Sequence, residues 1–163
     1  MRPNVGLERL AFGQSARRQG WASSVYFKHH DVRYSLPDEW WEEAGMRDAK
    51  LIGHSYLGGQ SLWPELEVCQ IAISDIQPLV RLGSYGVFND NAEFGTAHNR
   101  VVQILRGIRE QAPIPPVEVS RLPAGEFPTF KLIHGAHRLY CSIAVGFTHV
   151  PAVEVVDFFG IEE

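Results

Sequence analysis

The segment TFKLIHGAHR, residues 129–138, decides the expected fold. Its first half, Thr129–Ile133, is apolar and β-prone and predicts a strand. After Gly135 the chain continues with Leu139 and Ile143 at helical spacing, together with further apolar residues up to Phe147. Because glycine permits close backbone approach, the segment predicts a strand, a tight turn and a helix in direct succession.

Further elements lie on both sides of this segment. Before it, residues 68–76 predict a strand, residues 101–108 have the apolar spacing of a helix that Thr96 can cap, and residues 117–119 predict a second strand. After it, residues 152–156 predict the last strand. This order predicts a compact α/β (α+β) unit over residues 66–163, in which a mixed sheet packs against helices.

Residues 1–65 predict an N-terminal extension with an arm, a hairpin, a short helix and a loop. Strands 24–27 and 32–36 flank a polar turn, so that His29 and His30, like His54 further along, are expected to be surface histidines. Pro37 opens the short helix and Gly45 ends it. The neighbours Trp40 and Trp41 are not expected to face one core together.

Composition narrows the class of protein. With 163 residues the chain suits one domain, or one with an appendage, and its formal net charge of −4 excludes a global basic field for a polyanion. The two cysteines, Cys69 and Cys141, cannot form a disulfide framework and indicate a reducing compartment. Since no apolar run is long enough to span a bilayer, we expect a soluble, cytoplasmic protein without membrane partners.

The turn His134-Gly135-Ala136-His137-Arg138 has the features of an anion site. The first turn of the following helix offers unpaired N–H groups and the positive end of the helix dipole. Arg138 adds a permanently charged fork of donors that fits phosphate oxygens, and His137 can donate as well. An ordinary strand–helix turn with a surface arginine is the alternative interpretation of the same residues.

Four features follow one another along residues 71–155. They are the strand that leads into Asp75-Ile76-Gln77-Pro78 with Arg81 after it, the helix 101–109 followed by Pro113-Ile114-Pro115-Pro116-Val117-Glu118-Val119, the run Lys131-Leu132-Ile133-His134-Gly135-Ala136-His137-Arg138, and Gly146-Phe147-Thr148-His149-Val150-Pro151-Ala152-Val153. In this order they resemble the fold shared by ParB N-terminal domains, sulfiredoxin and free-serine kinases, and the resemblance covers a little over half of the chain.

The resemblance implies a nucleotide site. In that family the Gly-x-His-Arg turn binds nucleotide phosphates, which here implies Gly135, Ala136, His137 and Arg138, with Arg81 adding a charge from the loop side. A nucleotide such as ATP, ADP or CTP, bound with Mg²⁺, is the implied cofactor. A small-molecule kinase or nucleotide hydrolase also needs a carboxylate to orient or deprotonate the acceptor. For this catalytic role the resemblance implies the loop 83–99. Glu93 is the expected base, and His98 is the second expected catalytic residue.

Other functions are disfavoured or left open by particular residues. Sulfiredoxin has its catalytic cysteine where this chain has Ala136. Cys141 lies one helical turn beyond the Gly-x-His-Arg turn and Cys69 is expected in the core, so sulfinic-acid reduction is disfavoured. The acidic net charge disfavours a DNA-binding partition protein, and no clustered carboxylates support a nuclease. His134, His137 and Cys141 are three and four residues apart, a spacing that could bind zinc from one helical face. No fourth ligand is evident, so the sequence predicts no metal site.

The alternative of another class is a non-catalytic module. Such a protein would sense a nucleotide or phosphate without turnover and would present Trp40, Trp41 and the N-terminal region to a protein partner. Neither the acceptor nor the oligomeric state follows from the sequence.

Overall fold

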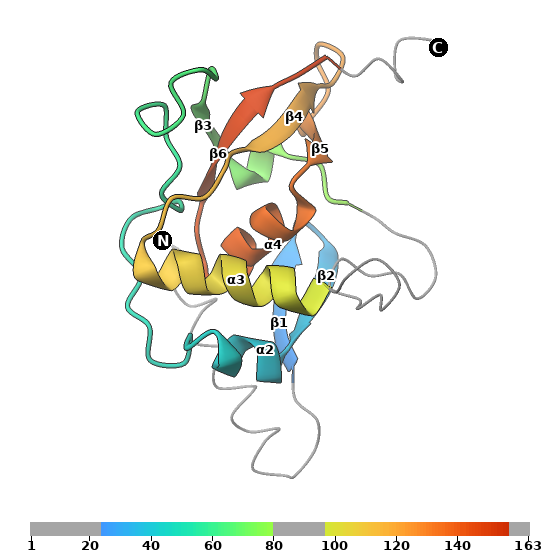
Figure 1. Ribbon diagram of the computed structural model, residues 1–163. Coiled ribbons are helices and arrows are strands. Elements are labelled where there is room, and N and C mark those ends of the chain that lie inside the picture. The colour runs from blue at the N-terminus through green and yellow to red at the C-terminus, as the bar shows by residue number, and fades with distance from the viewer. Residues whose placement is uncertain (1–23, 80–96, 157–163) are drawn as a thin grey trace.

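The computed structural model describes residues 24–79 and 97–156 of the chain. Within these ranges the chain forms a four-stranded mixed sheet, a two-stranded antiparallel hairpin and three α-helices (Figure 1). The α+β architecture confirms the fold class expected from the sequence. In chain order the elements are β1 (Ser24–His29), β2 (Val32–Pro37), α2 (Asp38–Glu43), β3 (Cys69–Ala72), the 3-10 turn η1 (Ile73–Asp75), α3 (Ala97–Glu110), β4 (Val117–Arg121), β5 (Phe130–His134), α4 (Ala136–Ala144) and β6 (His149–Glu154).

The four-stranded sheet has the order β3-β6-β4-β5. The inner strands β6 and β4 are parallel, and each outer strand runs antiparallel to its neighbour. The strand that the sequence predicts up to Ile76 ends at Ala72, because η1 turns the chain there. Ile76 then forms a parallel bridge with Phe130 of β5, and the Gln77 N–H donates to the Phe130 carbonyl at 2.7 Å. The segment after β3 therefore reaches the opposite edge of the same sheet.

Helix α4 lies between the four-stranded sheet and the hairpin (Figure 1). Its residues from Leu139 to Ala144 are all buried, and the helix contacts β1 as well as β4 and β6. Helix α3 packs beside α4, and it buries Val101, Leu105 and Ile108, whose spacing of four and three residues puts them on one face. This periodicity is the one that the sequence predicted. Together these contacts fix the position of the first turn of α4.

The hairpin belongs to the same core. Its register pairs His29 with Val32, so that the connection has two residues, and His30 takes a positive φ of 55°. The alternation expected of a strand places Val25, Phe27 and His29 inside. Residues from the ranges 25–56, 71–79 and 97–152 contribute to one hydrophobic core. The division into 1–65 and 66–163 stays a prediction, and the hairpin is an integral layer of the structure.

Two expectations for the N-terminal region were wrong. His29 is 3% exposed and is therefore no surface histidine, because β1 extends through it and its side chain points inward. Trp40 and Trp41 are both buried in the one core, since α2 is a short helix enclosed by neighbours on more than one side. Neither tryptophan is displayed to a partner in this structure.

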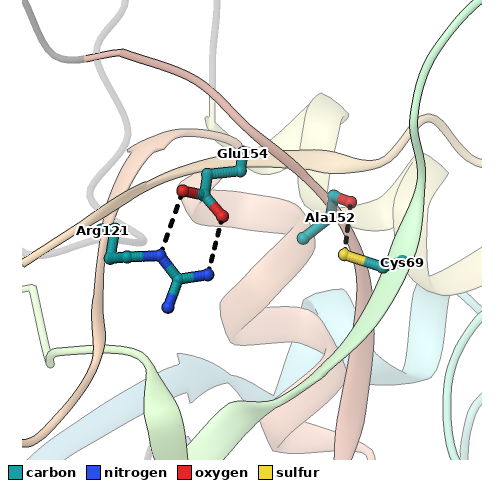
Figure 2. A network of polar contacts seen from close by, with 4 residues as sticks. All are labelled: Cys69, Arg121, Ala152 and Glu154. Atoms are coloured by element: carbon teal, nitrogen blue, oxygen red, sulfur yellow. Dashed lines mark hydrogen bonds and ion pairs between the residues drawn. The ribbon is translucent and has the colours of Figure 1, made fainter.

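Cys69 is exposed, which corrects its expected place in the core. It lies on the outer strand β3, and its thiol donates to the Ala152 carbonyl of β6 across a distance of 3.7 Å (Figure 2). Figure 2 also shows Arg121 of β4 forming two hydrogen bonds to the Glu154 carboxylate of β6, at 2.9 and 3.2 Å. Because β3 lies at the edge of the sheet, near the polar pair of Arg121 and Glu154, the apolar sequence of the strand does not bury Cys69.

A search of residues 24–79 and 97–156 finds no helix with the length and apolarity that crossing a membrane requires.

Candidate functional site

The candidate site is the turn from β5 into α4, residues 134–138. Gly135 is the residue before the helix and has φ 103° and ψ 32°, a left-handed conformation. A Cβ atom at this position would lie 2.8 Å from Cγ1 of Val117 on β4, closer than real Cβ contacts come. Both the backbone conformation and the approach to β4 therefore require glycine. The turn is closed by the Leu139 N–H, which donates to the Gly135 carbonyl at 2.9 Å.

No negative charge in the first turn of α4 offsets the positive end of the helix dipole. Gly135 provides no side-chain cap, and the first turn contains no acidic residue. Ala136, His137 and Arg138 are each half-buried, so that this end of the helix borders solvent. Since the N-terminal N–H groups and the helix dipole favour negative charge, the local environment suits an anion.

Arg138 is held in place beside this turn. Its Nη1 donates to the carbonyl oxygens of Pro115 at 3.1 Å and Pro116 at 2.8 Å, in the segment that leads into β4. Its Nη2 lies 3.2 Å from the position of a Cβ built on Gly135, so the guanidinium stands over the glycine. Among the described residues Nε and Nη2 have no hydrogen-bond partner. The arginine is thus fixed through one nitrogen and keeps two for a ligand.

The other residues predicted for the nucleotide site are distributed differently. Arg81 and Glu93 lie outside the described residues. His98 belongs to the first turn of α3, and its Nε2 lies 2.8 Å from the Glu43 carboxylate. Its ring also stacks on Trp40, with centroids 5.0 Å apart and an angle of 14° between the planes. The catalytic role of His98 stays a prediction, and the observed contacts tie it to α2.

The residues weighed for zinc are not brought together as a metal site. His134 is exposed at the end of β5, whereas Cys141 is fully buried within α4. Burial raises the pKa of the Cys141 thiol, which keeps the sulfur protonated and unsuited to metal binding. Within the described part of the chain, no three His, Cys, Asp or Glu side chains are grouped so that they could hold a metal ion.

A buried polar cluster of three side chains was missed by the sequence analysis. It consists of His29 on β1, Tyr34 on β2 and Tyr140 on α4. The Tyr140 hydroxyl lies 3.2 Å from Nδ1 of His29 and 3.1 Å from the Tyr34 hydroxyl, and it accepts the Leu79 N–H at 2.6 Å. Nε2 of His29 lies 3.1 Å from the Ile73 carbonyl oxygen. The cluster thus joins the hairpin and α4 to the end of the segment after β3.

The signal that could have found this cluster is the alternation in β1. Val25, Phe27 and His29 are spaced two apart, so a strand that buries the first two also buries the third. The partner Tyr140 lies 111 residues further along, and no local pattern links the two.

Three comparisons with known proteins gave no match. No family model, no curated protein and no solved structure matches the chain. The resemblance to ParB N-terminal domains and sulfiredoxin stays a prediction, and the functional argument depends on the geometry of the turn.

Proposed function

We propose that the protein binds the phosphate groups of a nucleotide at the turn formed by Gly135, Ala136, His137 and Arg138. The observation that carries this proposal is the Arg138 guanidinium, which two carbonyl oxygens hold over Gly135 while Nε and Nη2 keep no partner among the described residues. An arginine fixed before the ligand arrives loses less side-chain entropy on binding. Its remaining donors match the spacing of phosphate oxygens.

The backbone adds to this support. Gly135 has no side chain that would keep a phosphate away from the N–H groups of the helix, and no carboxylate in the first turn competes for them. His137, half-buried in the same turn, is proposed as a further donor. Arg81 is proposed to add a second positive charge.

The nucleotide is proposed to be ATP, ADP or CTP, bound with Mg²⁺. A kinase or hydrolase would use Glu93 as its base. The alternative is a module that binds the nucleotide without turnover, and its proposed display of Trp40 and Trp41 is not retained because both are buried. Turnover in the presence of Mg²⁺ separates the two.

The proposed location is the cytoplasm. Cys69 and Cys141 are both free thiols, one exposed and one buried. An exposed free thiol is stable in a reducing compartment and vulnerable to oxidation elsewhere.

Calorimetric titration of ATP, ADP and CTP, each with and without Mg²⁺, tests the proposal. We expect one of them to bind the wild type and to lose about tenfold or more in affinity in Arg138→Ala, since charge-assisted hydrogen bonds contribute roughly 1.5–3 kcal/mol. Arg121→Ala is the matched control, because Arg121 is an exposed arginine on β4 whose partner is Glu154. Equal affinity in wild type and Arg138→Ala, or no binding of any nucleotide, would overturn the proposal.

A further inference from the structure

Two histidines outside the candidate nucleotide site face each other. His54 comes from the loop between α2 and β3, and His149 is the first residue of β6. Their ring centroids are 4.8 Å apart, and the ring planes make an angle of 81°. His54 is exposed and His149 half-buried, so that the pair is open to solvent.

The two segments that carry the histidines are joined through their backbones. The carbonyl oxygen of His54 accepts the N–H of Thr148 at 3.2 Å and that of His149 at 3.0 Å. The Thr148 carbonyl in turn accepts the N–H of Ile73 at 2.9 Å, which attaches the same point to η1. Main-chain hydrogen bonds therefore hold together the two backbone segments that carry the imidazoles.

One ring also has an orienting partner. Nδ1 of His149 lies 2.9 Å from the Thr148 hydroxyl oxygen. When Nδ1 carries the proton and donates it to this oxygen, Nε2 has a free lone pair. A hydrogen bond of this kind to the second ring nitrogen is the usual support of a histidine that binds a metal ion.

We propose that His54 and His149 together bind a divalent transition-metal ion of the Zn²⁺, Cu²⁺ or Ni²⁺ class. Two imidazoles that share a tetrahedral ion at about 2.0–2.1 Å place their ring centres roughly 5 Å apart. The observed separation of 4.8 Å between the ring centroids is close to this value. Imidazole nitrogen selects these ions over Mg²⁺ and Ca²⁺, which prefer oxygen ligands.

The site is an open one. Among the residues that the structure describes, no third His, Cys, Asp or Glu joins the pair. In the proposed complex the other positions around the ion are left to water, which can exchange for a small ligand. The site shares no residue with the turn 134–138, and its presence does not depend on nucleotide binding.

Copper and zinc titrations of the full chain test this inference. We expect one Cu²⁺ ion whose electron paramagnetic resonance spectrum reports two imidazole nitrogens, and one nitrogen in His54→Gln or His149→Gln. Zn²⁺ affinity measured by calorimetry is expected to fall at least tenfold in either variant. Thr148→Val is expected to weaken binding about tenfold, because it removes the orienting partner.

The control is His134→Gln, which removes an exposed histidine at the end of β5 and is expected to bind both metals like the wild type. Circular dichroism melting curves establish that each variant is folded. Loss of binding in His134→Gln with retention in His54→Gln would overturn the inference. A copper spectrum that is the same in the wild type and in the variant that combines His54→Gln with His149→Gln would also overturn it.

Discussion

Tyr56 and Arg138 donate hydrogen bonds to the same acceptor, the carbonyl oxygen of Pro115. The Tyr56 hydroxyl lies 2.6 Å from this oxygen and Nη1 of Arg138 lies 3.1 Å from it. Tyr56 is buried, which raises the pKa of its hydroxyl and keeps it a donor, although the positive charge of Arg138 acts in the opposite direction. A tyrosine in the loop before β3 thereby helps to position the arginine of the candidate site.

Tyr56→Phe is expected to weaken nucleotide binding without removing any group that contacts the ligand. The substitution removes the hydrogen bond that holds the Pro115 carbonyl in place, so the oxygen that accepts Nη1 of Arg138 is positioned less firmly. We expect a loss of about threefold to tenfold in affinity, corresponding to roughly 1 kcal/mol for one hydrogen bond. Calorimetry measures it. Tyr34→Phe is the control, because it removes a hydroxyl bonded to the Leu79 carbonyl and is expected to lower stability alone.

Gly135→Ala is expected to destabilise the fold by about 2–5 kcal/mol. A left-handed conformation costs an L-residue about 1–2 kcal/mol, and forcing a methyl group into packed surroundings costs about 1–3 kcal/mol more. Urea denaturation measures the change. Gly125→Ala is the matched control, because its φ of 89° is also left-handed while no atom lies within 4 Å of its Cβ position. Equal losses in the two variants would show that the approach to Val117 has no energetic weight.

Stability is expected to fall in mild acid because of His29. Burial lowers the pKa of this imidazole below 6.5, and the hydrogen bond to the Ile73 carbonyl only partly opposes the effect. Well above pH 6.5 the imidazole is neutral in both the folded and the unfolded state, and its contribution to stability is complete. As the pH falls below that value, the unfolded chain binds the proton first, so the free energy of unfolding declines.

Urea midpoints measured from about pH 8 to pH 5 check this expectation, since histidine titrates in that range. His29→Gln removes the titrating group and is expected to flatten the profile between these limits. His134→Gln, which alters an exposed histidine, serves as the control and is expected to keep the slope of the wild type. An unchanged slope in His29→Gln would contradict the assignment.

His98→Gln separates a structural from a catalytic role of this residue. The imidazole stacks on Trp40 and contacts the Glu43 carboxylate, so its loss is expected to lower stability by about 1 kcal/mol. Nucleotide affinity is expected to stay within twofold of the wild type. If the protein shows turnover, a variant that keeps full stability but loses turnover would instead favour the catalytic role.

The elements with strong local patterns could be predicted from the sequence. The apolar residues of α3 have helical spacing, and the hairpin alternates on both sides of a polar turn. The place of Gly135 between the strand and the helix could also be predicted, because the backbone there takes a left-handed conformation that favours glycine. In these places the local preference and the tertiary structure agree.

What could not be predicted depends on contacts between distant segments. The polar neighbours of His29 predict a surface position, while its burial depends on Tyr140 on α4. The apolar character of Cys69 predicts a place in the core, while the sheet order leaves β3 at an edge. The two carbonyls that hold Arg138 lie 22 and 23 residues before it and have no sequence signature.

The sheet order also has a consequence for biosynthesis. Strand β6, the last described strand along the chain, pairs with both β3 and β4 and is the link between them. While a chain emerges from the ribosome, at about 5–20 residues per second, β3 has no partner strand until residues 149–154 have left the exit tunnel. Until then the edges of β3 are unpaired, and the yield of the protein is expected to depend on a ribosome-bound chaperone.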